Sequence, residues 1–192
     1  MKNTFIAICL LIVISCSPAK NPVLYDLVTI TTPLGEIIFK LHDETPVHKK
    51  SFIKLVEQGY FDEYTFNRVI NNFVAQGGCP DTAAGFADSP YLLDPEFNDS
   101  LTHIYGAVGA GRDDNPEMLS AGCQFYIVQN SEGLHRLDNK YTIFGQVVKG
   151  MDIVDAIVSV ETDTLDAPLE PILLKLANFQ MDSVSLAELI NQ

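Results

Sequence analysis

Between residues 24 and 181, the chain consists mainly of short runs of β-branched and aromatic residues that alternate with turn-forming residues. The first two runs are residues 25–32 and 36–41, and Pro33-Leu34-Gly35 between them is typical of a β-hairpin. Similar runs recur further along the chain, at residues 66–70, 73–76, 104–110, 124–129, 143–149 and 172–181. So many short strands favour a closed or nearly closed β-barrel, because a sheet that closes on itself leaves no exposed edge.

Only two segments have the spacing of a helix. Thr45 can cap a helix that starts with Pro46 at its first position and stops at Gly59. A second, shorter helix is predicted for residues 151–158, where apolar side chains recur at helical intervals. We therefore predict a mainly β domain, a closed antiparallel β-barrel with two helices covering its ends.

The first residues are typical of an export signal. Lys2 precedes an apolar run at residues 5–14, which is shorter than a membrane-spanning helix requires. The tetrad Val13-Ile14-Ser15-Cys16 resembles the lipobox of bacterial lipoproteins, in which the signal is cut before the cysteine and the thiol is acylated. An ordinary signal peptide with a cysteine at its boundary is the alternative.

We accordingly divide the chain into a lipoprotein signal peptide at residues 1–15, a lipidated tether at 16–23, one domain at 24–183 and a C-terminal tail at 184–192. This division predicts a protein of the bacterial cell envelope that is held to a membrane through Cys16 and faces the periplasm or the exterior.

Charge and histidine placement argue against two kinds of site. The chain has 12 Lys and Arg against 25 Asp and Glu, a net charge of −13, so it should repel nucleic acid. The four histidines are scattered without the spacing of metal ligands, so we expect no metal site.

Residues 64–78 carry the most informative motif, in which Arg68, Phe73 and Gln76 stand on two predicted strands around a turn at Asn71-Asn72. This segment resembles the signature of the cyclophilins, and two further blocks match in the same order, at residues 122–128 and 137–147. The resemblance extends from about residue 24 to about residue 181. It implies a cyclophilin-type barrel and peptidyl-prolyl cis-trans isomerase activity.

The resemblance also assigns site residues. It implies that Arg68 and Gln76 are catalytic and that the substrate groove is formed by Phe73, Val74, Gly111, Gln124, Tyr126, Leu137 and Tyr141. Three positions depart from well-known members of the family: Tyr141 stands in place of a histidine, Arg136 in place of a tryptophan, and Gly111-Arg112 in place of an Ala-Asn pair. These departures bear on substrate preference and drug binding.

Elementary chemistry explains why an arginine suits this reaction. Rotation about an X-Pro bond is slow because amide resonance raises a barrier of roughly 18–20 kcal/mol. At the twisted midpoint the prolyl nitrogen regains a lone pair, and a guanidinium that donates to it stabilises that state selectively. The reaction needs no cofactor. We expect proline-containing polypeptide segments as partners and a monomeric protein, with a non-catalytic module that holds such segments in the same groove as the alternative.

Cys79 and Cys123 stand where the family commonly has an aspartate and a serine. Their neighbours Gln76 and Gln124 are expected to face the same groove, so the two sulfur atoms could lie within bridging distance. A disulfide and two separately packed thiols both remain open, and the separate thiols are the slightly preferred interpretation.

Overall fold

The computed structural model describes residues 22–79 and 92–191. The predicted signal peptide, Cys16 and most of the tether lie outside these ranges, so the predictions made for them are not tested by the fold. Within the described ranges no helix is long and apolar enough to cross a membrane.

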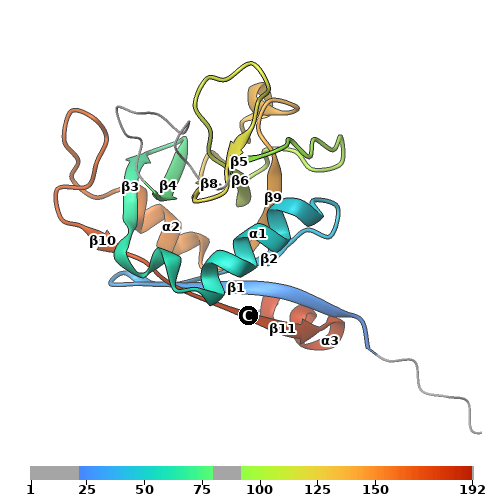
Figure 1. Ribbon diagram of the computed structural model, residues 1–192. Helices are drawn as coiled ribbons and strands as arrows, with labels where there is room; N and C mark the ends of the chain where they lie inside the picture. The colour runs from blue at the N-terminus through green and yellow to red at the C-terminus, as the bar shows by residue number, and fades with distance from the viewer. Residues whose placement is uncertain (1–21, 80–91, 192) are drawn as a thin grey trace, which may run out of the picture.

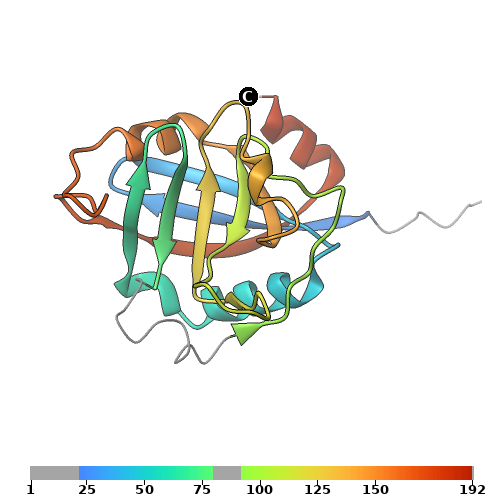
Figure 2. The same ribbon diagram turned by 90° about the horizontal axis from the view of Figure 1, so that it is seen from above.

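In the described residues, the domain is built on a nine-stranded antiparallel sheet, in the spatial order β10-β3-β4-β8-β6-β9-β2-β1-β11. Its strands, in chain order, are β1 (Leu24–Thr32), β2 (Gly35–Leu41), β3 (Thr65–Ile70), β4 (Val74–Gly78), β6 (Ala107–Ala110), β8 (Gln124–Val128), β9 (Ile143–Lys149), β10 (Ile172–Leu173) and β11 (Lys175–Asp182). A small second sheet pairs β5 (Leu92–Leu93) with β7 (Ser120–Ala121). Figure 2 shows β3, β4, β8 and β6 crossing over the long strands β1 and β11, so the sheet is strongly curled.

The closed barrel that we predicted is wrong, because the curled sheet is open between its two edge strands, β10 and β11. β10 pairs with β3 over only two residues, whereas β11 pairs with β1 over eight. Between them, the Leu174 N–H donates to the carbonyl oxygen of Tyr64. The chain therefore changes partner at Leu174, and the covalent backbone rather than a hydrogen-bonded ladder joins the two edges.

In the described part of the chain, three α-helices accompany the sheet, where we predicted two. The predicted helices are confirmed as α1 (Pro46–Glu57) and α2 (Met151–Val158), which lie along opposite open ends of the curled sheet (Figures 1 and 2). The third, α3 (Ser183–Ile190), occupies the segment that we assigned to a C-terminal tail. It starts where the Asp182 carboxylate accepts hydrogen bonds from the Val184 and Ser185 N–H groups, a side-chain cap of the ordinary kind.

The N-terminus of α1 is capped by a residue that the sequence did not indicate. Thr45 makes no side-chain capping bond, and its buried hydroxyl has no hydrogen-bond partner among residues 22–79 and 92–191. Instead, the carboxylate of Glu96, 48 to 49 residues further along the chain, accepts the Val47 N–H at 3.0 Å and the His48 N–H at 2.9 Å. The same carboxylate lies 2.7 Å from Nδ1 of the buried His48 ring. Glu96 therefore fixes the loop that leads toward β6 against α1.

The main core fills the space between the curled sheet and the helices. Phe52 from α1 packs against Phe39 of β2, Phe125 of β8 and Phe144 of β9, with ring centroids 5.2–5.8 Å apart. α2 adds Val154 and Ile157, which are fully buried in the same cluster. This core packs against one face of β4, β8 and β6, and the candidate site lies on the opposite face of the same strands.

Candidate active site

The hairpin of β3 and β4 places the two predicted catalytic residues next to each other. Asn72 adopts a left-handed conformation, φ 59°, at the turn between the strands. Arg68 and Gln76 are then directly paired across the ladder, and the Arg68 guanidinium lies 3.5 Å from the Gln76 amide oxygen. The turn that we expected at Asn71-Asn72 is confirmed, and it brings both side chains to one face.

An apolar cluster next to this pair forms the floor of the site. Tyr126 on β8 lies opposite Gln76 in the ladder and is 6% exposed. It packs with Val74, and Phe73, Leu137 and Tyr141 pack at the margin of the same cluster. The Tyr126 and Tyr141 rings meet edge to face, with centroids 6.2 Å apart.

These side chains enclose a groove with a cavity volume of about 280 Å³. All nine residues that we predicted for catalysis and substrate binding line it: Arg68, Phe73, Val74, Gln76, Gly111, Gln124, Tyr126, Leu137 and Tyr141. Two further lining residues, Arg112 and Arg136, stand at positions that depart from the family pattern. At both positions an arginine replaces an uncharged residue of the family, an asparagine at 112 and a tryptophan at 136. This change was the sequence signal for a role in the site.

The Arg68 guanidinium stands at the edge of the apolar floor, where its side chain is 36% exposed. Its other neighbours are Asp166, with a nitrogen–oxygen distance of 3.7 Å, and the Phe73 ring, whose centroid is 6.0 Å from the guanidinium carbon. Both contacts are long, so the guanidinium retains hydrogen-bond donors for a molecule in the groove.

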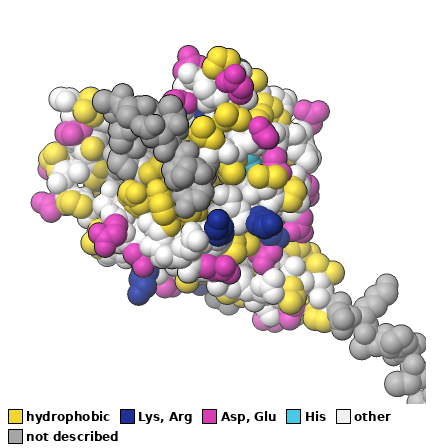
Figure 3. All heavy atoms as spheres, in the orientation of Figure 1, with side chains coloured by type: hydrophobic (Ala, Val, Ile, Leu, Met, Phe, Trp, Pro, Cys, Tyr) yellow, Lys and Arg dark blue, Asp and Glu magenta, His cyan; other side chains and the backbone are white. Residues whose placement is uncertain are grey.

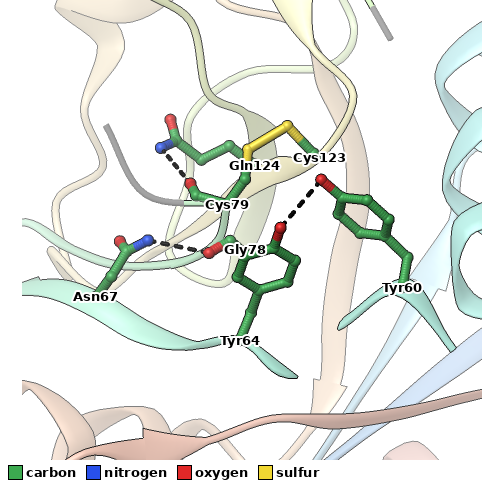
Figure 4. Close-up of a disulfide and its surroundings, with 7 residues drawn as sticks. All are labelled: Tyr60, Tyr64, Asn67, Gly78, Cys79, Cys123 and Gln124. Carbon is green, nitrogen blue, oxygen red and sulfur yellow. Dashed lines mark hydrogen bonds between the residues drawn. A yellow bond between two sulfur atoms is a disulfide. The ribbon is translucent and has the colours of Figure 1, made fainter. Parts of the chain in front are cut away.

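A disulfide between Cys79 and Cys123 borders the groove, so the slightly preferred interpretation of two separate thiols was wrong (Figure 4). The bond joins the end of β4 to the start of β8 across 44 residues, with α-carbons 5.4 Å apart. Next to it, the Gln124 amide donates to the Cys79 carbonyl oxygen at 3.0 Å. A Cβ on Gly78, whose φ is 94°, would collide with the Cys123 carbonyl, so only glycine fits this close approach.

Gly111 lets the Gln124 side chain lie flat in the groove wall. The backbone N–H of Gly111 donates to the Gln124 carbonyl oxygen at 3.1 Å. A Cβ on Gly111 would overlap the side-chain amide of Gln124. A larger residue at 111 would therefore displace a groove residue.

A buried polar network that was not predicted from the sequence lies beneath the floor. The fully buried His103 lies between Tyr126, with 2.8 Å from Nε2 to the phenol oxygen, and Asp138, with 2.7 Å from Nδ1 to a carboxylate oxygen. Burial lowers the pKa of His103 below its ordinary value of 6.5, although Asp138 opposes the shift. A neutral ring can then donate from Nδ1 and accept the phenol proton at Nε2.

The same network fixes the charge states around it. Burial raises the pKa of Tyr126 well above its ordinary value of 10. Burial also acts to raise the pKa of Asp138, but hydrogen bonds from His103 and His135 outweigh it, and the net pKa is lowered. Tyr126 is thus a neutral hydroxyl and Asp138 an anion at neutral pH. Among residues 22–79 and 92–191, no group of three His, Cys, Asp or Glu side chains is placed to hold a metal ion.

Comparison with known proteins identifies the family of the chain. Residues 27–178 match the family model of the cyclophilin type peptidyl-prolyl cis-trans isomerases. A peptidyl-prolyl cis-trans isomerase of Acinetobacter baylyi is 32% identical over 170 residues, which cover 84% of this chain and 88% of the relative.

Solved structures agree as well. The crystal structure of a cyclophilin type isomerase from Cryptosporidium parvum superimposes with a TM-score of 0.72 and 24% identity, covering 81% of this chain and 98% of that one. The structure of the same Cryptosporidium protein in the presence of the dipeptide Ala-Pro gives a TM-score of 0.70 and 25% identity, covering 79% and 97%. The family model matches most of the chain, the Acinetobacter relative is 32% identical over 84% of it, and the fold is the same curled, mainly β fold. The chain therefore belongs to the cyclophilin-type peptidyl-prolyl cis-trans isomerases.

Proposed function

We propose that Arg68 accelerates rotation about X-Pro bonds by donating a hydrogen bond to the prolyl nitrogen of a segment bound in the groove. The observation that carries this role is the position of the guanidinium, at the edge of an apolar floor and 3.5 Å from Gln76. Phe73, Tyr126 and Leu137 would receive the proline ring, since they offer apolar surface at the base of the groove. Gln76 would orient the guanidinium or hold a substrate carbonyl.

The energetic argument rests on selective stabilisation of the twisted amide. The planar cis and trans forms have little lone-pair density on the nitrogen, so the hydrogen bond strengthens only as resonance is lost. Removal of one such donor from a protected site typically costs a factor of about 10² to 10³ in rate. No proton transfer or bond cleavage is required, and the residues that line the groove suffice for this mechanism.

Replacing Arg68 tests the proposal. We expect Arg68→Ala to lower kcat/KM for a short X-Pro peptide by about 100-fold while leaving the thermal unfolding profile close to that of the wild type. Arg68→Lys keeps the charge but loses the planar fork of donors, so it should recover only a small part of the activity. The measurement is NMR exchange between cis and trans peptide. Turnover by Arg68→Ala near the wild-type level would contradict the role, and peptide binding without turnover in the wild type would favour a holding module.

We further propose that the enzyme works on exported proteins while lipid-anchored in the bacterial cell envelope. The support is the signal-like N-terminus and the Val13-Ile14-Ser15-Cys16 tetrad. Cys16→Ala should release the protein from the membrane fraction without lowering isomerase activity, because the groove lies in the folded domain. Fractionation of expressing cells decides this, with Cys9→Ala as the matched control. Membrane association of Cys16→Ala that withstands a salt wash would rule out the anchor.

A further inference from the structure

The whole sequence contains three arginines, Arg68, Arg112 and Arg136, and all three line the groove. The chain as a whole is strongly acidic, with a net charge of −13. On the face shown in Figure 3, the charged side chains are mostly acidic. The concentration of guanidinium groups in one groove of such a protein therefore calls for a functional reason.

Two of these arginines are held over the aromatic rings that border the proline site. The Arg136 guanidinium lies 5.0 Å from the centroid of the Phe73 ring, and the Arg112 guanidinium lies 4.5 Å from that of Tyr141. Arg112 is fixed further, because it donates to the Lys140 carbonyl at 3.0 Å and to the Asp113 carbonyl at 2.8 Å. Stacking on a ring orients a guanidinium while leaving its edge available to an anion.

Among the described residues, neither Arg112 nor Arg136 forms a salt bridge. Within residues 22–79 and 92–191, no carboxylate oxygen lies within 4.0 Å of a side-chain nitrogen of Arg112 or Arg136.

The acidic side chains next to the two arginines form hydrogen bonds with other residues. The Asp113 side chain accepts a hydrogen bond from Asn115, and the Asp138 carboxylate is bound by His103 and His135. Lys140 donates to the Arg136 carbonyl and adds a further cation at the rim.

We propose that the groove prefers X-Pro segments that carry an aspartate or glutamate next to the proline, with Arg136 and Arg112 as the residues that bind its carboxylate. This inference rests on the proposed function, because it places the proline ring on the floor beside Phe73 and Tyr141. A proline seated there puts its neighbouring residues within reach of the two guanidinium groups at the rim. Guanidinium and carboxylate form paired, charge-assisted hydrogen bonds, which explains the choice of arginine over lysine.

The long-range field strengthens the preference. An acidic segment is repelled by most of this protein's surface and attracted by the groove, so its productive orientation is favoured during the encounter. The preference should therefore weaken with salt, whereas apolar contacts of the proline ring should not.

The test uses end-blocked tetrapeptides, so that no terminal carboxylate competes with the side chain. Two pairs differ only in Glu against Gln, placed directly before the proline in one pair and directly after it in the other. For at least one pair, we expect kcat/KM of the wild-type enzyme to be about fivefold higher for the Glu peptide, which corresponds to about 1 kcal/mol. The ratio should fall toward one in about 0.5 M NaCl, because salt screens exposed charges.

Variants locate the effect. Arg136→Gln or Arg112→Gln should bring the Glu-to-Gln ratio toward one, and the ratio is informative even if either change also alters overall turnover. Lys50→Gln removes one positive charge from the exposed face of α1, away from the groove, and should leave the ratio unchanged.

Equal kcat/KM for Glu and Gln peptides in both pairs would overturn the preference while leaving the proposed function intact. The absence of turnover on every peptide would instead overturn the proposed function. A ratio that falls equally in Lys50→Gln would show a general charge effect and refute the assignment to the groove arginines.

Discussion

The Cys79–Cys123 disulfide should make a large contribution to the stability of this domain. The two cysteines are separated by 44 residues, and the bond joins the ends of β4 and β8 beside the groove. Cross-linking a loop of this length lowers the entropy of the unfolded chain enough to stabilise the fold by about 4 kcal/mol in the chain-entropy model. For a chain of this size, about 4 kcal/mol corresponds to a shift in Tm of roughly 8–16 °C.

The assay is thermal unfolding, with and without a reductant, of the wild type and of the double variant Cys79→Ala/Cys123→Ala. We expect reduction to lower the Tm of the wild type by about 10 °C and to leave the variant, which already unfolds at the lower temperature, unchanged. The variant also serves as the control for any effect of the reductant elsewhere. A wild-type Tm that moves by less than about 3 °C on complete reduction would refute the entropic argument.

The bond should also affect the groove. Gln124 donates to the Cys79 carbonyl, and the Cys79 N–H donates to the Cys123 carbonyl at 2.9 Å, so the disulfide and two hydrogen bonds hold one wall together. Tyr60 also packs against the small buried cluster of Ala121 and Cys123. Reduction should therefore raise KM for an X-Pro peptide more than it lowers kcat, because Arg68 and Gln76 lie on the hairpin and are held independently of the bond.

Two further predictions concern the supports of the fold. Glu96→Ala should lower the free energy of unfolding by about 1–2 kcal/mol in urea titration, because it removes the cap of α1, whereas Glu44→Ala, an exposed acid just before the same helix, should change it little. Stability should also fall on acidification, since burial lowers the pKa of His42, His48 and His103 below 6.5 in the folded protein. The unfolded chain binds these protons first, so each histidine reduces the free energy of unfolding by at most about 1.4 kcal/mol per pH unit as the pH falls from 6.5 toward the folded pKa. Urea midpoints that stay constant from pH 7.5 to pH 5.5 would contradict this expectation.

Elements with a strong local pattern could be predicted from the sequence. The Pro33-Leu34 turn, the extents of α1 and α2 and the β3–β4 hairpin were predicted from residues close together in the chain and are confirmed, although Glu96 rather than Thr45 caps α1. The nine groove residues could be placed because their motifs match a known family in the right order. Their individual roles remain predictions.

Features that depend on distant residues could not be predicted in this way. Glu96 caps α1 from almost fifty residues away, and nothing in its own neighbourhood distinguishes it from a solvated acid. The open edge between β10 and β11 depends on a single change of partner at Leu174 within what looks like one continuous strand. Whether two cysteines bond depends on a distance between α-carbons that only the folded sheet defines.

The network below the groove shows how strongly such distant residues depend on each other. A tyrosine at the floor of an apolar site buries a hydroxyl, which is costly unless the hydroxyl finds a partner. His103 supplies the acceptor, but a buried imidazole needs a partner for its own N–H group, and Asp138 provides it. Each of the three polar groups would be unfavourable alone, and each is satisfied by the next, until the chain of bonds reaches an acid at the surface. Positions 103, 126 and 138 therefore have to change together: an apolar residue at 103 is tolerable only if position 126 also loses its hydroxyl.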